Sequence, residues 1–170
     1  IALTKTSGVD VDLRLRLGAT PLGRLSVSNN STYYSSVKVA TDAGDPLLEY
    51  AGTFFYPRWR NVLTFNLESA VWAGTLSVRS TASLRDTEQE FGSDAYNNAR
   101  RVGTHEEVDV GLQYTGLRDL TLSGSIKNLL DRDVPFSQRG ATNQNGSAGF
   151  PFLYSPRGRF FQVGLNYRFK

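Results

Sequence analysis

Residues 9–17 read VDVDLRLRL, and this stretch decides the fold that we expect for the chain. Every second residue is aliphatic, and the residues between them are aspartates and arginines. Successive side chains of a β-strand point to opposite faces of the sheet, whereas a helix repeats about every 3.6 residues. A strand over these residues therefore has one aliphatic face and one charged face.

The same alternation returns along the chain and predicts seven antiparallel strands in meander order. The other six strands are expected at residues 24–39, 59–68, 75–85, 108–114, 120–127 and 161–169. Within 24–39, the polar residues Asn29 and Ser31 fall on the face of Leu25. We expect a β-bulge near residues 29–34 to restore the pattern.

The connections between these strands alternate in length. Tight turns are expected at residues 18–23, 69–73 and 115–119, and long loops at residues 40–57, 86–105 and 131–158. Short turns on one side and long loops on the other are typical of outer-membrane barrels. We therefore predict an all-β fold, an antiparallel transmembrane β-barrel, and keep a soluble β-sandwich as the alternative, because its strands also alternate.

In a barrel wall the apolar residues in the middle of each strand would face lipid. This prediction applies to Val11, Leu13, Leu63, Phe65, Val110, Leu122 and Val163. Aromatic residues are expected near both ends of the strands, where a membrane barrel places its girdles: Trp59 at the loop end, and Trp72 and Tyr114 at the turn end.

The composition excludes several functional classes. There is no cysteine, so disulfides, thiolate metal sites and cysteine nucleophiles are excluded. The net charge of +3 is small and its basic residues are scattered, which argues against a nucleic-acid partner. Motifs of hydrolases, P-loops and dinucleotide-binding folds are absent. We expect no enzymatic activity, no cofactor and no metal site, and we interpret the single histidine, His105, as a loop-edge residue.

Five short motifs resemble the closing part of TonB-dependent outer-membrane receptors. Residues 128–131 read NLLD and 135–137 read PFS, 154–161 read YSPRGRFF, and 163–169 read VGLNYRF. Upstream, residues 56–60 read YPRWR. In the family, the first of these motifs leads into the last extracellular loop and the fourth forms the final strand. Their order and spacing together make the resemblance specific. The resemblance covers essentially the whole chain.

The resemblance implies a 22-stranded barrel with a plug domain in its lumen and an N-terminal TonB-box peptide. Seven strands cannot close such a barrel, so we expect residues 1–170 to be its C-terminal segment, with the plug and the earlier strands outside this chain. The implied location is the bacterial outer membrane. The implied partners are the remaining strands and the plug, on the same or a second chain, the TonB–ExbB–ExbD complex, outer-membrane lipid with lipopolysaccharide, and a small nutrient.

Two sets of residues are candidates for function. Long-loop aromatics beside polar donors suit ligand capture, although loop packing explains the aromatics almost as well. The substrate-binding candidates are Tyr56, Arg58, Tyr96, Arg132, Arg139, Asn143, Asn145, Phe152 and Tyr154. The charged faces of the strands supply lumen-lining candidates, for which a mutual salt-bridge lattice is the structural alternative. These are Arg14, Arg16, Arg60, Arg79, Asp109, Gln113 and Lys127.

The functional hypothesis is active import of a scarce nutrient by binding followed by gating. An iron–siderophore, haem, cobalamin, an oligosaccharide or a peptide would all fit this hypothesis. The alternatives are a passive porin-like or structural outer-membrane barrel and the soluble β-sandwich binding module. A plug and a TonB box upstream of residue 1 would favour import over a passive barrel.

Overall fold

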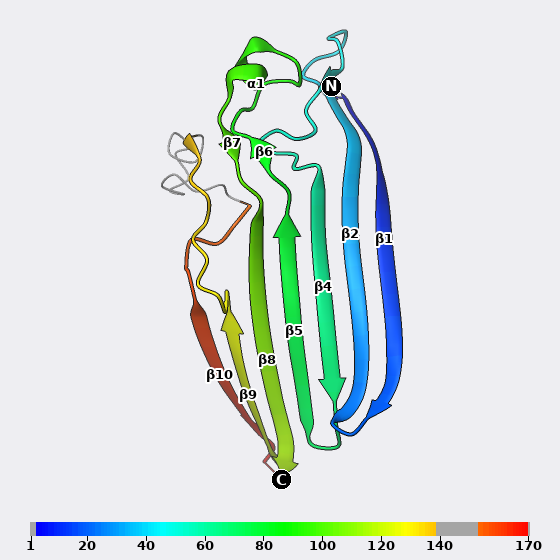
Figure 1. The fold of residues 1–170 in the computed structure, drawn as a ribbon, viewed down its shortest axis with the longest axis vertical. Helices are drawn as coiled ribbons and strands as arrows, with labels where there is room; N and C mark the ends of the chain where they lie inside the picture. Colours follow the sequence, from blue (N-terminus) through cyan, green and yellow to red (C-terminus); the bar gives the residue numbers. More distant parts are fainter. Residues whose placement is uncertain (1–2, 139–152, 170) are drawn as a thin grey trace.

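The computed structural model describes residues 3–138 and 153–169 of the chain. Seven long strands form one antiparallel sheet in the order β1-β2-β4-β5-β8-β9-β10, so each strand pairs with its neighbours along the chain (Figure 1). Their bounds are Leu3–Thr20 (β1), Gly23–Ala40 (β2), Trp59–Glu68 (β4), Trp72–Thr81 (β5), His105–Leu117 (β8), Leu120–Lys127 (β9) and Phe160–Tyr167 (β10). The predicted all-β meander is confirmed.

The pairing register separates the two faces of the sheet as the alternation predicts. Phe65 on β4 lies opposite Leu76 on β5, and Leu76 lies opposite Val110 on β8. Residues in such a row share a face. This apolar face continues to β10, where Val163 and Leu165 are exposed. The opposite, polar face carries the charged residues of the same strands.

The β-bulge lies later than we predicted from the sequence. Ser7 pairs with Ser36 while Gly8 pairs with Tyr34, so Ser35 is the extra residue of β2. The bulge therefore follows residues 29–34 and does not change the alternation within them. A side chain at Gly8 would clash with the carbonyl of Tyr33, so this position opposite the bulge needs glycine.

Asn29 and Ser31 consequently remain on the apolar face, where polar partners satisfy them. The Nδ2 of Asn29 donates to Oδ1 of Asn61 at 2.8 Å, and the Nε1 of Trp59 donates to Oγ of Ser31 at 2.8 Å. Register pairing continues this polar row across the sheet through Ser31, Asn61, Ser80 and Glu106. The row separates the apolar band below it from the loop end of the sheet.

Aromatic residues mark the turn end of the apolar face. Trp72 and Tyr114 lie opposite each other on β5 and β8, with ring centroids 4.3 Å apart. Tyr167 contacts Phe169 edge to face at 4.8 Å. The strands of this end are joined by tight turns, one of which places Asp119 at a φ of 57°. Aromatic pairs thus close the band where the sequence predicts a girdle.

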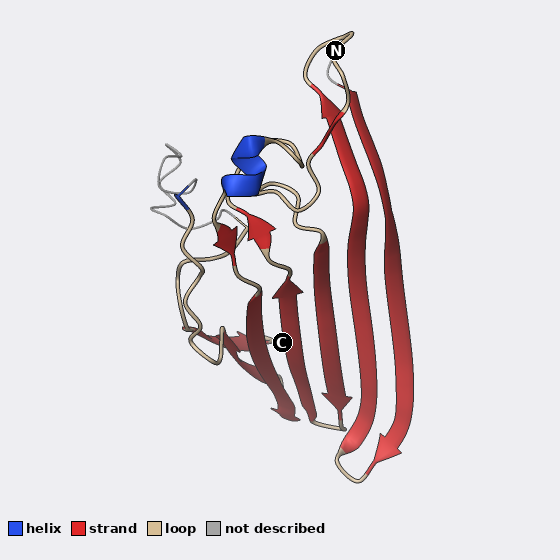
Figure 2. Ribbon diagram, turned by 45° about the horizontal axis from the view of Figure 1, so that its top comes forward, coloured by secondary structure: helices blue, strands red, loops and turns tan. Residues whose placement is uncertain are grey.

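The loop end of the sheet carries a folded cap, which comprises residues 41–58, 82–104, 128–138 and 153–159 (Figure 2). It contains β3 (Leu48–Glu49), which pairs with β2, the small sheet of β6 (Leu84–Arg85) and β7 (Arg101–Val102), and α1 (Asp94–Asn98). Phe54, Leu84 and Val102 form its buried core, against which Leu153 packs. The predicted long loops are therefore largely ordered in the described part of the chain.

One predicted strand ends earlier than expected because of this cap. We expected the strand over residues 75–85 to continue to Arg85, but β5 ends at Thr81. Leu84 leaves the sheet and is almost completely buried in the cap core. Burial of this apolar side chain against Phe54 and Val102 outweighs continued pairing in the main sheet.

α1 is a single short turn with a local cause. Ser93 precedes it, and the Ser93 hydroxyl oxygen accepts a hydrogen bond from the backbone N–H of Tyr96. This is the usual N-cap interaction, and Asp94 in the first turn adds a favourable charge. Among the described residues, no helix has both the length and the apolar character needed to cross a membrane.

We predict that Phe54→Ala loosens the cap without unfolding the sheet. Removing a fully buried phenylalanine typically costs about 3–5 kcal/mol, because a cavity remains. Hydrogen–deuterium exchange should become faster in residues 82–102 and stay slow in β4 and β5. The neighbouring Phe55→Ala is the matched control, since Phe55 is 41% exposed. Equal effects of the two variants would contradict the proposed cap core.

Candidate functional site

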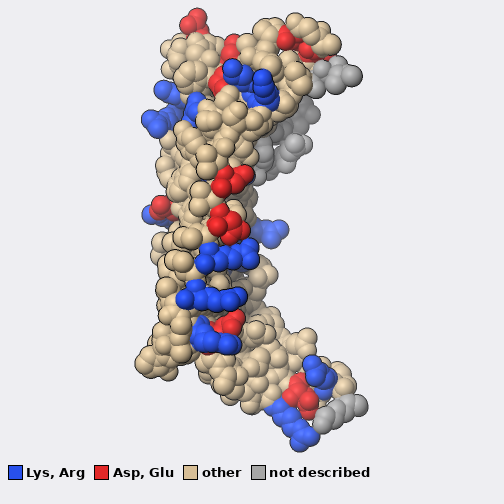
Figure 3. Space-filling model, turned by 90° about the vertical axis from the view of Figure 1, so that its right-hand side faces the viewer, with Lys and Arg blue, Asp and Glu red and all other residues tan. Residues whose placement is uncertain are grey.

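The polar face begins with a line of charged side chains on the edge strand β1. Asp10, Asp12, Arg14 and Arg16 follow one another on alternate residues, acidic toward the cap and basic toward the turns. Figure 3 shows a column of acidic and basic side chains along this side of the molecule. Arg14 pairs with Asp12 at 3.3 Å, and both side chains are exposed. An exposed pair of this kind contributes little to stability.

These arginines line an open groove of about 840 Å³ on the polar face. Its remaining walls come from β2 and β4, which contribute hydroxyl and amide side chains such as Ser28, Asn30 and Asn66. The groove thus combines guanidinium donors with neutral hydrogen-bonding groups. Such a surface suits contact with another polar surface more than enclosure of a small molecule, since the groove has no cover in the described part of the chain.

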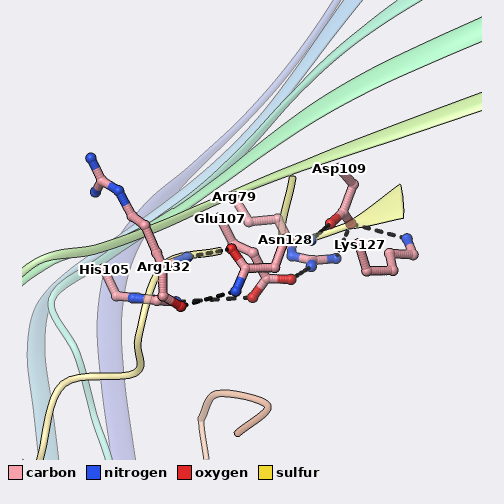
Figure 4. A network of polar contacts seen from close by, with 7 residues as sticks. All are labelled: Arg79, His105, Glu107, Asp109, Lys127, Asn128 and Arg132. Carbon is pink, nitrogen blue, oxygen red and sulfur yellow. Dashed lines mark hydrogen bonds and ion pairs between the residues drawn. The ribbon is translucent and has the colours of Figure 1, made fainter. Parts of the chain in front are cut away.

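A denser ion-pair network lies on β5, β8 and β9 (Figure 4). Arg79 contacts Glu107 and also pairs with Asp109 at 3.0 Å. Lys127 donates to the same Asp109 carboxylate at 3.0 Å, and the backbone N–H of Asn128 donates to its second oxygen at 3.0 Å. Asp109 is buried, so these three donors compensate for the loss of water around its charge.

The network continues into the NLLD motif at residues 128–131. The Asn128 side chain accepts from the backbone N–H of Arg132 and donates to its carbonyl, both at 2.9 Å. Asp131 in turn accepts from the backbone N–H of Arg159 at 2.8 Å. Both motif residues, Asn128 and Asp131, have positive φ angles. The motif therefore forms a tight turn that joins the end of β9 to the segment before β10.

A cavity of about 370 Å³ lies next to this network, where the polar face meets the cap. Its walls include Arg60 on β4, Arg79 and Thr81 on β5, and His105 and Glu107 on β8. Leu153, Tyr154 and Ser155 cover one side. We expected His105 to be a loop-edge residue; it is the first residue of β8, but it is buried.

Tyr154 packs on His105, with ring centroids 4.6 Å apart. Among the described residues, neither the Tyr154 hydroxyl nor the Nε2 of His105 has a hydrogen-bond partner. The nearest charge to this nitrogen is Glu107, at 3.9 Å. Burial raises the pKa of the Tyr154 hydroxyl, which therefore remains protonated and able to donate at neutral pH.

Other substrate-binding candidates are part of the cap. The Arg58 guanidinium lies over the Phe91 ring at 5.8 Å, and Phe91 packs against Tyr96 at 4.9 Å. The Arg85 guanidinium lies over the Tyr96 ring, 5.7 Å from the ring centroid. Tyr56 contacts Tyr50, with centroids 6.5 Å apart. These aromatic residues pack against one another, so part of the cap surface is held in place before any ligand arrives.

The remaining candidates are dispersed. Arg132 pairs with Glu106 at 3.5 Å, on the other side of β8 from Glu107. Gln113 lies on the polar face close to the turn end, opposite Ala73 and Ser123. Arg139, Asn143, Asn145 and Phe152 lie outside the described residues. The structure therefore brings together Arg60, Arg79, Asp109, Lys127 and Tyr154, and leaves Arg14, Arg16 and Gln113 elsewhere on the same face.

Sequence reasoning missed Glu107 and Asn128 as members of this cluster. The parity of Glu107 matches that of Asp109, so the alternation alone could have placed it on the polar face. The sequence marks Asn128 only as the first residue of the NLLD motif. The contact between His105 and Tyr154 had no sequence signal, because 48 intervening residues separate the two positions. Within the described ranges, no three acidic or histidine side chains gather in a way that could hold a metal ion.

Two carboxylates organise the cap. Asp86 accepts from the Ser137 hydroxyl at 2.5 Å and from the backbone N–H of Gln138 at 2.7 Å. Glu49 accepts from the Ser36 hydroxyl and from the backbone N–H groups of Val37 and Ala51, at 2.8 and 2.9 Å. Each carboxylate therefore connects segments that are distant in the chain or belong to different elements.

The protonation of Glu49 follows from these contacts. Burial by itself would raise the pKa of its carboxyl, but the hydrogen bonds and the nearby Arg58 outweigh burial and hold the pKa below its ordinary value. The stability that Glu49 contributes is therefore present above the ordinary glutamate pKa. It is lost as the pH falls through the lower pKa of the folded state.

Comparisons with known proteins add a structural similarity. No protein-family model and no curated protein sequence matches this chain. Its structure is similar to the crystal structure of the ferric-catecholate import receptor Fiu from K12 E. coli in its closed form, with a TM-score of 0.59 and 16% sequence identity. The match covers 98% of this chain and 21% of that receptor. The chain therefore has the fold of a segment of that receptor's β-barrel.

At this identity the similarity establishes the fold and not the ligand. The chain spans about a fifth of the length of the receptor it matches. The matched protein is a transport receptor and not an enzyme, in line with the sequence prediction.

We predict that acid loosens the cap through Glu49. As the pH falls from 6 to 3, backbone exchange at Val37 and Ala51 should accelerate beyond the intrinsic pH effect, because the protonated carboxyl is a weaker acceptor. Glu49→Gln should exchange faster already at neutral pH and lose this additional dependence. Exchange should be measured by mass spectrometry with Asp42→Asn, an exposed cap residue, as the control. A wild-type profile identical to that of Glu49→Gln would contradict the assignment.

Proposed function

We propose that the chain is a wall segment of a bacterial outer-membrane receptor that imports a small nutrient. The supporting observation is the uncovered apolar face. Val163 is 92% exposed, Leu165 68% and Val9 60%, although all three lie within strands. A soluble β-sandwich would bury such a face against a second sheet. In the described part of the chain, nothing packs over it, so lipid is the environment that fits.

The edges of the sheet support the same proposal. Within the described residues, β1 pairs only with β2, and β10 pairs only with β9. Unpaired backbone groups in a bilayer cost several kcal/mol each, so both edges need further strands. We propose that these strands and a plug domain belong to the same receptor, on this polypeptide or on a second one. The polar face then lines the lumen.

The different connections at the two ends of the strands support one direction of the wall in the membrane. The tight turns would lie on the periplasmic side and the cap outside the cell, where it meets the nutrient. Import would involve movement of the plug, driven by the TonB–ExbB–ExbD complex. The outer rim of the wall, around the polar row of Ser31, Asn61, Ser80 and Glu106, would lie near the lipopolysaccharide headgroups.

The imported compound would be captured by polar and aromatic groups of the cap and of the upper polar face. The matched receptor imports a ferric catecholate, and guanidinium groups beside aromatic rings, as at Arg58 and Phe91, suit a charged aromatic ligand. We therefore propose an iron–siderophore as the first substrate class to test, ahead of haem, cobalamin, oligosaccharides and peptides.

We predict different costs for a charge on the two faces of β9. Ile126 pairs with Val110 in the middle of the apolar band, and its neighbour Ser125 lies on the polar face. Ile126→Arg should destabilise the assembled receptor by about 2–4 kcal/mol, the cost of an arginine near the bilayer midplane, whereas Ser125→Arg should be mild. The measurement is urea unfolding of the receptor in lipid vesicles, with gel migration as a check of assembly. Equal costs on both faces would favour a soluble fold.

We also predict that import depends on TonB. Cells that rely on this receptor should accumulate a radiolabelled ferric siderophore, and deletion of TonB should abolish accumulation while leaving surface binding in place. Energy-driven import against a gradient requires this dependence, and a passive pore does not. Uptake that persists without TonB would support the porin-like alternative instead.

A further inference from the structure

The cavity between the polar face and Tyr154 differs from the neighbouring ion-pair network in one respect. In the network each charged group has a partner: Arg79 serves Glu107 and Asp109, and Lys127 serves Asp109. Two positive and two negative charges therefore balance. The adjoining cavity adds Arg60, whose guanidinium forms no ion pair among the described residues. The cavity wall consequently carries one uncompensated positive charge.

Two further polar groups of this cavity lack a partner in the described part of the chain. These are the Tyr154 hydroxyl and the Nε2 of His105. His105 is 6% exposed, so this ring is more than nine-tenths buried. Thr81 lies close enough to Tyr154 to lower its pKa somewhat, but their hydroxyls do not reach hydrogen-bonding geometry. A buried polar atom without a partner is unfavourable, and a bound group would relieve this cost.

The three groups belong to different elements that meet at the same place. Arg60 and Thr81 lie opposite each other on β4 and β5, and Thr81 lies opposite His105 on β8. Tyr154 reaches the row from the cap, and its ring packs at a tilt against that of His105. The ion pair between Arg79 and Glu107 joins β5 and β8 next to this row. On the cap side, Leu153, the neighbour of Tyr154, packs against the cap core. A cation and two potential donors thus converge on a preformed space.

We propose that this cavity binds an anionic oxygen group of the imported ligand, such as a carboxylate, a phosphate or a deprotonated phenol. Arg60 supplies the charge and hydrogen bonds. The Tyr154 hydroxyl donates a second bond, and His105 donates a third in the tautomer that carries its proton on Nε2. The inference rests on the proposed import function, because it assigns the occupant to the transported compound. It adds a binding site to the general role of the wall.

A purely structural role fits the observations less well. A buried polar atom that serves only to stabilise the fold is expected to have a partner within the fold. Within the described residues, the buried Nε2 of His105 and the buried hydroxyl oxygen of Tyr154 do not meet this expectation, and the exposed Arg60 beside them supplies a charge that water or a ligand can reach. The size of the cavity also exceeds that of a single water, since about 370 Å³ is within the usual range of small-molecule sites.

The test uses the complete purified receptor in detergent and two small fluorinated anions, trifluoroacetate and monofluorophosphate. Their ¹⁹F line widths are measured as the receptor is titrated. Arg60→Gln should weaken binding roughly 10-fold or more, and Tyr154→Phe about 2- to 10-fold, as expected for a charged and a neutral hydrogen bond. Arg24→Gln is the control, because Arg24 lies on the polar face at the far end and pairs with Glu68.

Three outcomes would overturn the proposal. The first is no saturable binding of either anion to the wild-type receptor. The second is an equal loss in all three variants, which would indicate general attraction by charge. The third is a structure of the complete receptor in which a plug side chain occupies the cavity and bonds to the Tyr154 hydroxyl. Tyr154→Phe removes a single oxygen, so it tests the site even if Arg60→Gln assembles poorly.

The result is distinguishable from a failure of the proposed import function. Anion binding is measured on purified protein and needs neither TonB nor a living cell. Loss of import with intact anion binding would contradict the transport proposal and leave the cavity as an anion site without transport. Intact import by Arg60→Gln and Tyr154→Phe, with unchanged affinity for the transported siderophore, would remove the cavity from the transport path.

Discussion

The alternation of apolar and polar side chains along each strand is the constraint on which this sheet depends most. A register shift of one residue would exchange the apolar and polar faces of a whole strand. The two irregularities of β1 and β2 lie where they do little harm. The extra residue Ser35 lies near the cap, and the extra residue Leu17 lies near the turn. Between them, the nine paired rows from Gly8 to Arg16 keep a constant parity, so the charged side chains stay on one side.

The polar face can hold charges because they are arranged around shared partners. Asp109 is the central example, with Arg79, Lys127 and the Asn128 backbone on its two oxygens. Removing any one donor would leave a buried carboxylate partly uncompensated. The same carboxylate therefore links three strands and the turn of the NLLD motif. In the cap, the carboxylate oxygens of Glu49 and Asp86 likewise accept several hydrogen bonds each, and these bonds connect segments with little regular structure.

Much of the fold could be predicted from the sequence, because period two is a local property. Runs such as VDVDLRLRL and residues 120–127 are read directly as strands. The cap could not be predicted, since its core joins Phe54, from the connection between β2 and β4, to Leu84 and Val102, from the connection between β5 and β8, without a common pattern. The burial of His105 was missed for the same reason, and the bulge at Ser35 lies just outside the predicted range of residues 29–34. Arg60, Arg79, Asp109 and Lys127 were assigned to one face by parity, but their grouping near Tyr154 depends on the path of the cap.

The meander order has a kinetic consequence. Every neighbouring pair of long strands is also consecutive among the long strands along the chain, and three of the connections are tight turns. Local pairing lowers the entropy lost in closing each hairpin, so the sheet can grow one hairpin after another. The cap behaves differently, because the bond from Ser137 to Asp86 spans 51 positions. The slow step of folding in this chain should therefore be the docking of its loops and not the zipping of its strands.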